Sequence, residues 1–349
     1  MRTKIVIVSI IWLITIFAGG SIFPGCQKKP SSNDVLGVFK TENKGESWQE
    51  KNITAENQSL KDSVVSLLAV DPADNNNVFV GINDLGLFRS TKNGDEWQAT
   101  GLTSGTPSEV AFDPNQKTIF YLAGSFSSRA KIYKSIDGGV NFGELFSDVK
   151  TETTVTSLKV DKQAPQKITA LLSSGVLMMS EDYGRNWQIK KDWEALPTDA
   201  IISPAINLVA FENNLWQSKD QAATWKDITK EINDKLDKKA ASKILGLSLD
   251  EKTDKVYLFS QNGLFISSDG GENWQETGAI NYPDKIKIGN IVVNQLNQEI
   301  YLSVNSSFYR STDNGQSWSI YQINDNNIEA IALDPKNQYQ IYLGMVNSK

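Results

Sequence analysis

The chain of 349 residues contains no histidine and only one cysteine, and it is acidic, with a net charge of −6 and a sequence pI near 5.0. Without histidine there is no Ser-His-Asp or Cys-His triad, no imidazole metal ligand and no general base whose unperturbed pKa lies near neutrality. A single cysteine excludes an intrachain disulfide and a multi-cysteine zinc site. The negative charge makes nucleic-acid backbones unsuitable partners. We therefore expect no metal, no cofactor and no nucleic-acid partner.

The amino terminus is predicted to be a signal peptide or membrane anchor that is not part of the fold. Residues 1–25 begin with the basic residues Arg2 and Lys4, and 19 uncharged residues follow from Ile5 to Phe23. A short basic start before an apolar run is typical of secretory signals and amino-terminal anchors. The run is also just long enough to span the core of a bilayer.

The only cysteine, Cys26, directly follows this run in the sequence Phe23-Pro24-Gly25-Cys26. The site resembles the cleavage site of bacterial lipoproteins, where a small residue precedes a cysteine that becomes lipidated. Gly25 fits that pattern, whereas Pro24 and Phe23 depart from it. The resemblance implies lipidation of Cys26, while an uncleaved anchor and plain secretion stay open as alternatives. Each option exports the remainder, so we expect a protein of the periplasm or cell exterior, with residues 26–35 as a polar tether.

The rest of the chain is built from a repeat of about 45 residues. Seven segments share the pattern S-x-D-x-G-x-x-W, and their closing aromatic residues recur at a mean spacing of 45. These closing residues are Trp48, Trp97, Phe142, Trp187, Trp225, Trp274 and Trp318. The third position of the pattern, which is aspartate in five copies, is occupied by Asn43, Lys92, Asp137, Asp182, Asp220, Asp269 and Asp313. Seven copies at regular spacing favour one repeat architecture over the two domains that chain length alone suggests.

Each copy of the motif, called a box here, predicts a β-hairpin. The alternating residues before it indicate a strand. The acidic residue, with glycine two positions later, indicates a tight turn in which the carboxylate accepts hydrogen bonds from backbone N–H groups. The closing aromatic residue opens the next strand and packs beneath the turn. In two copies Lys92 replaces the acidic residue and Ala222 replaces the glycine. We expect those two turns to be held more by packing than by hydrogen bonds.

Two further apolar runs precede each box, which gives four short strands per repeat, the content of a propeller blade. After Trp318 only two strands remain, at 328–333 and 340–346, while the strands at 37–41 and 48–51 begin the repeat region. We therefore predict an all-β, seven-bladed propeller of four-stranded antiparallel blades over residues 36–349. A composite blade with two strands from each end closes the ring and removes the exposed edges of an open array.

The repeated motif is identified as the Asp-box, also called the bacterial neuraminidase repeat. Seven copies in a single exported chain resemble the photosystem II stability/assembly factor family of propellers. They are similar, more loosely, to sortilin-type propellers and Asp-box glycosidases. The resemblance implies that the boxes lie on the outer hairpins, far from the ligand face, and are structural. It also implies partner binding through a basic, arginine-rich patch, and this acidic chain with five arginines departs from that pattern.

The residues of the chain support three classes of function to different degrees. A sialidase-like enzyme needs three arginines for its substrate carboxylate, yet only Arg129 lies in a ligand-side loop, because the other arginines belong to the leader, the boxes or the strands before them. Glycan binding, or a glycosidase with an Asp/Glu pair, stays open among 41 acidic residues. We favour a non-catalytic platform for a protein partner, tethered to the membrane by its amino terminus, because propellers present variable loops on a rigid face.

Candidate partner contacts lie outside the boxes. Trp193 fits neither a box nor a strand before one, so we expect an exposed contact residue or a residue that covers a seam between blades. Phe126, Arg129 and Tyr282 are weaker candidates of the same kind. Residues 229–241 predict a short amphipathic helix that either caps a blade edge or docks a partner. The densest group of basic residues belongs to this region and includes Lys235, Lys238 and Lys239.

Overall fold

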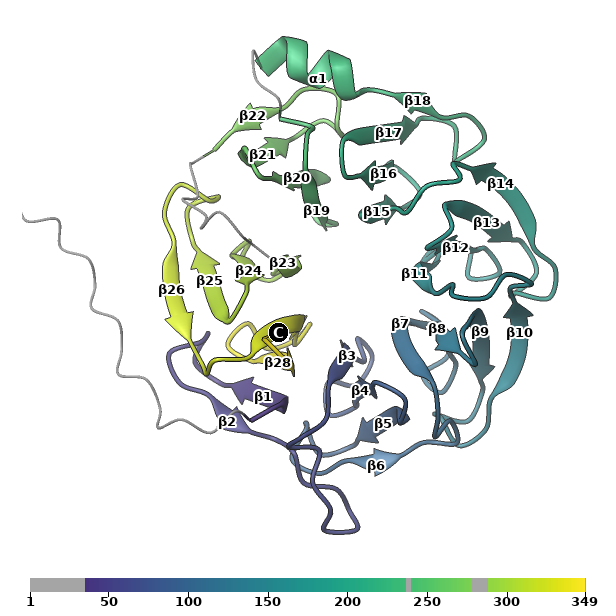
Figure 1. The fold of residues 1–349 in the computed structure, drawn as a ribbon, viewed down its shortest axis with the longest axis vertical. Coiled ribbons are helices and arrows are strands. Elements are labelled where there is room, and N and C mark those ends of the chain that lie inside the picture. The colour runs from purple at the N-terminus through teal and green to yellow at the C-terminus, as the bar shows by residue number, and fades with distance from the viewer. Residues whose placement is uncertain (1–34, 237–239, 278–287, 349) are drawn as a thin grey trace, which may run out of the picture.

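The structure is a computed structural model that describes residues 35–236, 240–277 and 288–348. Within these residues, 28 strands and one short helix are present, and the strands form seven four-stranded sheets around a central axis (Figure 1). All strand pairs within the sheets are antiparallel, so the predicted all-β, seven-bladed propeller is confirmed.

Six blades are contiguous in the chain, and in each the first strand lies nearest the axis and the fourth lies at the periphery (Figure 1). Blade 1 contains β3 (Val65–Val70), β4 (Val78–Ile82), β5 (Gly86–Ser90) and β6 (Gln98–Ala99). Blade 2 contains β7 (Thr106–Phe112), β8 (Phe120–Phe126), β9 (Arg129–Ser135) and β10 (Gly143–Ser147). Blade 3 contains β11 (Val155–Val160), β12 (Ile168–Leu172), β13 (Val176–Ser180) and β14 (Gln188–Asp192). Blade 4 contains β15 (Asp199–Ile202), β16 (Asn207–Phe211), β17 (Asn214–Ser218) and β18 (Lys226–Asp227). Blade 5 contains β19 (Ile244–Asp250), β20 (Lys255–Ser260), β21 (Gly263–Ser267) and β22 (Gln275–Glu276). Blade 6 contains β23 (Ile288–Val293), β24 (Ile300–Val304), β25 (Ser307–Ser311) and β26 (Ser319–Gln322).

Blade 7 combines strands from both ends of the chain. Its sheet has the order β2-β1-β28-β27, formed by β27 (Asn327–Leu333), β28 (Ile341–Val346), β1 (Gly37–Thr41) and β2 (Gln49–Glu50). Strand β1 pairs antiparallel with β28, from Gly37 opposite Met345 to Thr41 opposite Ile341. The ladder between β1 and β28 therefore joins the first and last strands of the described chain.

The hydrophobic core lies between neighbouring sheets. The second strand of a blade is buried on both faces, and Val80, Leu208 and Leu302 in β4, β16 and β24 have no exposed surface. Aromatic residues add large contacts between the sheets, such as Phe79 of blade 1 against Phe120 of blade 2, whose ring centroids lie 4.9 Å apart. Each blade thus buries its apolar faces against two neighbours, which explains why a single blade would not be stable alone.

Bulges in the innermost strands connect the blades around the axis. In β3 and β7 the register shifts at Ser66 and Ser108. The Ser66 hydroxyl donates to the carbonyl of Pro107 at 2.6 Å, and the Ser108 hydroxyl donates to the carbonyl of Val155 at 2.5 Å. Since a bulge frees a residue from its own ladder, the side chain can bond the next blade instead.

The single helix of the described residues, α1 (Thr229–Leu236), lies at the periphery beside blades 4 and 5 (Figure 1). Its buried residue Ile232 packs in the core cluster of these blades, with Leu236 packed against it. This agrees with the predicted amphipathic helix over its first eight residues; residues 237–239 lie outside the described part. Among the described residues, no helix is long and apolar enough to cross a bilayer.

Candidate functional site

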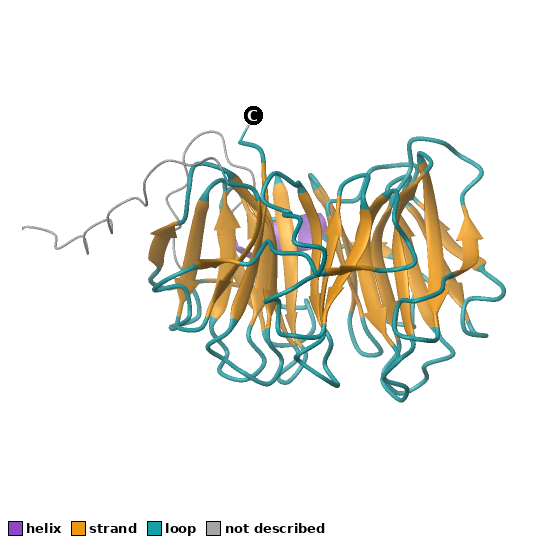
Figure 2. Ribbon diagram, turned by 90° about the horizontal axis from the view of Figure 1, so that it is seen from below, coloured by secondary structure: helices purple, strands orange, loops and turns teal. Residues whose placement is uncertain are grey.

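The ring has two faces, which differ in the connections that they carry (Figure 2). Because the strands of a blade alternate in direction, the connection from first to second strand and the box hairpin share one face, called the box face here. The hairpin from second to third strand and the connection to the next blade lie on the other, called the loop face. The carboxyl end of β28 leaves from the loop face, at the top of Figure 2.

The box hairpins are closed networks of hydrogen bonds. In blade 5, the hydroxyl of Ser267 donates to Asp269 at 2.8 Å and accepts the N–H of Gly271 at 2.8 Å. Asp269 also accepts the backbone N–H of Asn273 at 2.8 Å and its side-chain amide at 2.7 Å. The indole of Trp274 closes the turn by donating to the carbonyl of Gly271 at 3.0 Å. The box residues are thus occupied by their own turn, in agreement with a structural role.

These hydrogen bonds keep the box carboxylates charged. In Asp137, Asp182 and Asp220, bonds from the residue four positions later lower the pKa to about 2. Burial alone would raise the pKa of Asp269, but the bonds from Asn273 and Ser267 outweigh it and lower the pKa to about 2. A carboxylate of such low pKa is a poor proton donor at neutral pH, so the box aspartates do not suit general acid catalysis.

The two deviating boxes differ from each other. In the box of Ala222, Asp220 still accepts the N–H of Thr224 at 2.8 Å and its hydroxyl at 2.6 Å, so the expected loss of hydrogen bonds is wrong for this copy. Ala222 itself adopts a φ of +66°, a conformation that usually requires glycine. In the box of Lys92, the Ser90 hydroxyl and the Lys92 carbonyl accept N–H groups of the turn, and the Tyr342 hydroxyl of blade 7 donates to Asn93. The fully buried Trp97 packs beneath this turn, so packing and hydrogen bonds both hold it.

The box face is the more acidic of the two. In the described residues, its box hairpins and its connections between first and second strands contain nineteen acidic and nine basic residues. The acidic residues of the hairpins are Glu42, Glu46, Asp95, Glu96, Asp137, Glu181, Asp182, Asp220, Asp269, Glu272 and Asp313. The basic residues of the hairpins are Lys44, Lys92, Arg185 and Lys219. The box face therefore has an excess of ten negative charges.

The loop face is less charged. Its described hairpins and connections, with the peripheral α1 included, contain ten acidic and six basic residues. The six hairpins between second and third strands consist mainly of Ser, Asn and Gln, and Asp84 and Glu212 are their only charged residues. Three apolar side chains are exposed on the loop face of blades 1 to 3: Leu85 at 50%, Val149 at 86% and Leu196 at 70%. This face offers hydrogen-bonding and apolar groups but little net charge.

Three charged residues come together on the innermost strands of blades 2, 3 and 4. Lys159 of β11 lies 3.7 Å from Glu109 of β7, and its charge also acts on Asp199 of β15. Desolvation raises the pKa of both carboxyl groups, although 27% of the Glu109 side chain is exposed. Asp199 accepts the N–H of Ala200 at 2.7 Å and that of Leu247 at 2.8 Å, so it joins blades 4 and 5. The sequence reasoning missed this cluster, and a signal was available, because charged residues interrupt innermost strands that are otherwise mostly apolar.

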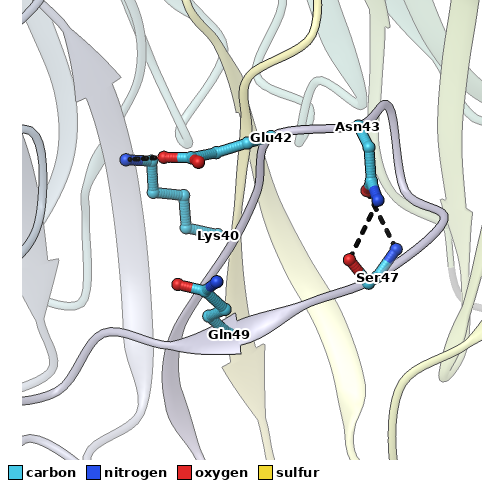
Figure 3. Close-up of a pocket in the computed structure, with 5 residues that line it drawn as sticks. All are labelled: Lys40, Glu42, Asn43, Ser47 and Gln49. Atoms are coloured by element: carbon cyan, nitrogen blue, oxygen red, sulfur yellow. Dashed lines mark hydrogen bonds and ion pairs between the residues drawn. The ribbon is translucent and has the colours of Figure 1, made fainter.

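A small depression lies on the box hairpin of blade 7 (Figure 3). It has a volume of about 250 Å³ and is lined by Lys40, Glu42, Asn43, Ser47 and Gln49. Lys40 forms an ion pair with Glu42 at 2.9 Å, and Asn43 and Ser47 are bonded to each other, so the polar groups satisfy one another. Ligand pockets usually measure roughly 300–1,000 Å³ and are mainly apolar. The depression therefore does not resemble a substrate site.

Trp193 is not the exposed contact residue that one alternative expected. Its ring packs edge-on to Trp225 at 5.1 Å and contacts Phe211 at 5.6 Å and Trp216 at 6.1 Å, all in blade 4. Because Trp193 follows β14 of blade 3, it fills the seam between blades 3 and 4, which was the other alternative. Its indole N–H is buried without a hydrogen-bond partner.

The weaker candidates are also tied into the ring. Phe126 is 4% exposed, and its ring packs against Tyr133 at 5.1 Å, so its expected role as a surface contact is wrong. Arg129 is half-buried and donates to the carbonyl oxygens of Asp148 and Val149, which fixes the connection after β10. Lys235 is exposed, and its ammonium group donates to the Glu272 carbonyl at 3.0 Å, which holds α1 on the box hairpin of blade 5.

Four candidates of the sequence analysis lie outside the described residues: Cys26, Tyr282, Lys238 and Lys239. Their roles stay predictions. Within the described residues, no group of three or more histidine, cysteine, aspartate or glutamate side chains could hold a metal ion.

Comparison with known proteins establishes the fold. No family model matches the chain, and no curated protein matches it in sequence. Among solved structures, YCF48 from Cyanidioschyzon merolae matches with a TM-score of 0.61 and 13% identity, over 81% of this chain and 95% of that chain. A structure of YCF48 bound to D1 peptide matches with a TM-score of 0.61 and 13% identity, over 91% of this chain and 97% of that chain. The propeller expected from the Asp-box resemblance is therefore confirmed.

Glycoside hydrolases share the same ring. The GH74 xyloglucanase from Xanthomonas campestris matches with a TM-score of 0.62 and 14% identity, over 81% of this chain and 51% of that chain. This chain thus spans about half the length of that enzyme, whereas it spans nearly all of the YCF48 chains.

Proposed function

We propose that this chain is an exported, membrane-tethered and non-catalytic propeller that binds a protein partner, as an assembly factor does. The observation that carries the proposal is the match of one ring to nearly the whole of the YCF48 chains, one of which is bound to a peptide. Binding needs only a rigid face with suitable loops, which this ring offers on its loop face. The identity of the partner and a link to photosystem II stay outside the proposal.

The tether rests on the sequence of residues 1–34. Arg2 and Lys4 precede the uncharged run that ends before Cys26. Lipidation of Cys26 after export would attach the ring to a membrane that faces the periplasm or the cell exterior. An uncleaved anchor would give the same attachment without a lipid.

A glycan-binding protein or glycoside hydrolase is the second candidate, and one observation favours it. Glu109 and Asp199 both have a raised pKa, as a catalytic acid needs, and the GH74 enzymes share the ring. Against this, both oxygens of Asp199 accept backbone N–H groups, and Glu109 is paired with Lys159. These contacts engage both carboxyl groups within the ring, which suits proton transfer to a substrate poorly.

Affinity capture with the full-length chain, solubilised from membranes, tests the proposal. We expect recovery of a protein partner and no turnover of a glycan panel. Failure to recover a partner, together with glycan turnover that Glu109→Gln abolishes, would overturn it in favour of the hydrolase. An unrelated tethered protein that passes through the same capture identifies background binding.

Labelling with a radioactive fatty acid tests the anchor separately. We expect label in the wild-type chain and none in Cys26→Ala. Label that survives this substitution would refute lipidation at Cys26. Recovery of unlabelled wild-type chain in the membrane fraction would favour the uncleaved anchor.

A further inference from the structure

The fourth strand of each blade lies at the edge of its sheet, on the rim of the ring (Figure 1). The N–H and C=O groups of such an edge are a template for another strand, and proteins protect them with short strands, charges or bulges. Five of the seven fourth strands are protected by an acidic residue at the second position after the box aromatic residue, or by a length of two residues. The acidic residues are Glu50, Glu144, Asp227 and Glu276, and the uncharged short strand is β6 with Ala99.

Blades 3 and 6 contain isoleucine at this position, and their edges differ in protection. Ile189 of β14 is 69% exposed, but a bulge at Lys190 follows it and Lys191 adds a second charge. Ile320 of β26 is 58% exposed, the strand pairs with β25 without a shift in register, and its four residues carry no charge. Among the fourth strands that the structure describes, β26 is therefore the only one of more than two residues without a charge or a bulge.

The backbone of Ile320 has its hydrogen-bonding groups on the open edge. In blade 5, Thr277 donates its N–H to the carbonyl of Leu264 at 3.1 Å. Tyr321 holds the same place in blade 6, three residues after the box tryptophan and opposite Phe308. Bonded and non-bonded pairs alternate along an antiparallel ladder, so Tyr321 bonds β25 and the N–H and C=O of Ile320 point away from it.

The surroundings of β26 specify the kind of segment that fits its edge. Tyr309 lies opposite Ile320 and packs in the core of blades 5 and 6, so Ile320 extends an apolar strip to the surface. A strand added beside β26 places alternate side chains on this strip. At the box-face end of β26, hydrogen bonds from Ser317 lower the pKa of Asp313 and keep it charged, and Glu50 is exposed on the neighbouring rim. These negative charges favour basic residues at the ends of the segment.

From the open edge and its surroundings, we propose that β26 binds an extended segment of another protein, which adds to blade 6 as a fifth, antiparallel strand. Backbone hydrogen bonds to Ile320 supply the affinity, and the apolar strip selects segments with apolar residues at alternate positions. The segment carries a basic residue at each end. This contact lies on the rim and goes beyond the proposed function, whose partner contacts the loop face.

Two other occupants fit the edge less well. A second copy of this chain presents an uncharged β26 beside the same acidic residues, so it lacks the basic ends. The chain's own residues 27–34 join the ring at Val35, whose carbonyl accepts the side-chain amide of Asn324 near the loop-face end of β26. A segment that ends there and follows β26 runs parallel to it, and this one contains Pro30, which has no N–H to donate.

Peptide binding with variants of the edge tests the proposal. The solubilised full-length chain is applied to an array of heptapeptides with lysine at both ends, valine or isoleucine at positions 3 and 5, and threonine or serine between them. Ile320→Pro removes the outward N–H and keeps the ladder with β25, because proline is tolerated where an edge strand faces solvent. We expect the array to retain at least tenfold less of Ile320→Pro than of the wild-type chain. Ile320→Val, which keeps the N–H, and Ile189→Pro, on the edge of β14, should be retained within twofold of the wild-type amount.

Ile320→Lys is a second variant, since it places a charge on the edge and leaves the backbone intact. We expect the same tenfold loss with an unchanged melting temperature, so this variant decides the matter if Ile320→Pro unfolds the blade. No retention of the wild-type chain, or equal retention of Ile320→Lys, would overturn the proposal.

Hydrogen exchange at the N–H of Ile320 separates the three occupants. In the free full-length chain we expect fast exchange, and a retained heptapeptide should slow it at least tenfold. Slow exchange in the free chain at every concentration would show that its own leader covers β26. Exchange that slows as the chain concentration rises would show that a second copy covers it. Either of these results would overturn the proposal.

Discussion

The ammonium group of Lys44 donates to the carboxylate of Glu299 at 2.8 Å and joins blade 7 to blade 6. Lys44 lies in the first box of the chain and Glu299 directly before β24. Glu299 also accepts Arg310 at 2.9 Å and the hydroxyl of Tyr301 at 2.5 Å. Burial alone would raise the pKa of Glu299, but these bonds outweigh it and hold the pKa at about 2. The contact thus attaches the amino-terminal strands of the composite blade to the carboxyl-terminal half of the ring.

Substitution Glu299→Gln is expected to destabilise the ring, because it leaves the cations of Lys44 and Arg310 without their anionic partner. The side chain of Glu299 is only 10% exposed, so water replaces this partner poorly. Breaking a largely buried pair in this way costs about 3 kcal/mol. Because the folded-state pKa is lowered, the stabilisation is present above the unfolded pKa and is lost as the pH falls toward about 2. Denaturant unfolding at several pH values measures this. The exposed pair of Lys162 and Glu251 is the control, since Glu251→Gln should change the free energy of unfolding by less than about 1 kcal/mol.

Substitution Gly315→Ala is expected to destabilise more than Gly139→Ala. Both glycines have positive φ, at +84° and +98°, so alanine is strained at either box by about 1 kcal/mol. At position 315 an added Cβ would also lie 2.3 Å from Leu264, whereas at position 139 the nearest atoms lie at 3.4 Å. Overpacking typically adds 1–3 kcal/mol, or about 2 kcal/mol here. Equal midpoints of the two variants in denaturant unfolding would contradict the prediction.

The fold could be predicted because its signal is repeated. The box and its spacing depend on local chemistry, and a turn closed as by Ser267, Asp269 and Gly271 favours the same residue types, so most copies keep them. The composite blade followed from counting the strands left at each end. The box turns and the strand count can be predicted from the sequence, because neither requires knowledge of which distant residues come into contact.

The candidate contacts were harder to predict because exposure depends on neighbours. Trp193 and Phe126 stand in or beside loops of the sequence, yet the adjacent blade or strand covers both. The cluster of Glu109, Lys159 and Asp199 was missed because its members lie on three separate innermost strands that meet only when blades 2, 3 and 4 pack together. The sequence of one blade shows a charged residue on its innermost strand, but not which charges of other blades that residue meets.

Substitution Asp182→Asn is expected to lower stability at neutral pH and to leave it unchanged in strong acid. Hydrogen bonds from Asn186 lower the pKa of Asp182 to about 2, so the carboxylate stabilises the fold above its unfolded pKa and loses this effect as the pH falls through about 2. Asn43 occupies the same position in the first box and accepts the N–H of Ser47 at 2.9 Å, so asparagine fits the turn. Thermal unfolding of both proteins from pH 7 to pH 2 measures the difference. A gap in melting temperature that stays constant over this range would show that geometry, and not charge, is responsible.

Substitution Trp193→Ala is expected to destabilise the ring, because it empties the seam filled against Trp225 and Phe211. Removing a largely buried aromatic side chain costs about 3 kcal/mol. Trp193→Phe should cost less, since its ring still occupies part of the seam. Leu196→Ala is the control, because Leu196 is 70% exposed in the same connection and its truncation should cost less than about 0.5 kcal/mol. Unchanged stability of Trp193→Ala would restore Trp193 as a candidate surface contact.

Substitution Glu109→Gln is expected to raise stability at neutral pH. Desolvation raises the pKa of Glu109 above its ordinary value, and the attraction of Lys159 only partly offsets it. A carboxyl group with a raised folded-state pKa destabilises the fold once it is ionised, so the wild-type chain loses stability as the pH rises from the unfolded pKa through the folded pKa. The neutral amide avoids this loss, and the advantage of Glu109→Gln should disappear below about pH 4, where the wild-type carboxyl group is protonated in both states. Denaturant unfolding of both chains between pH 3 and pH 8 measures the difference, with Glu251→Gln as the exposed control. A loss of stability at neutral pH would instead show that the ion pair with Lys159 outweighs the desolvation of Glu109.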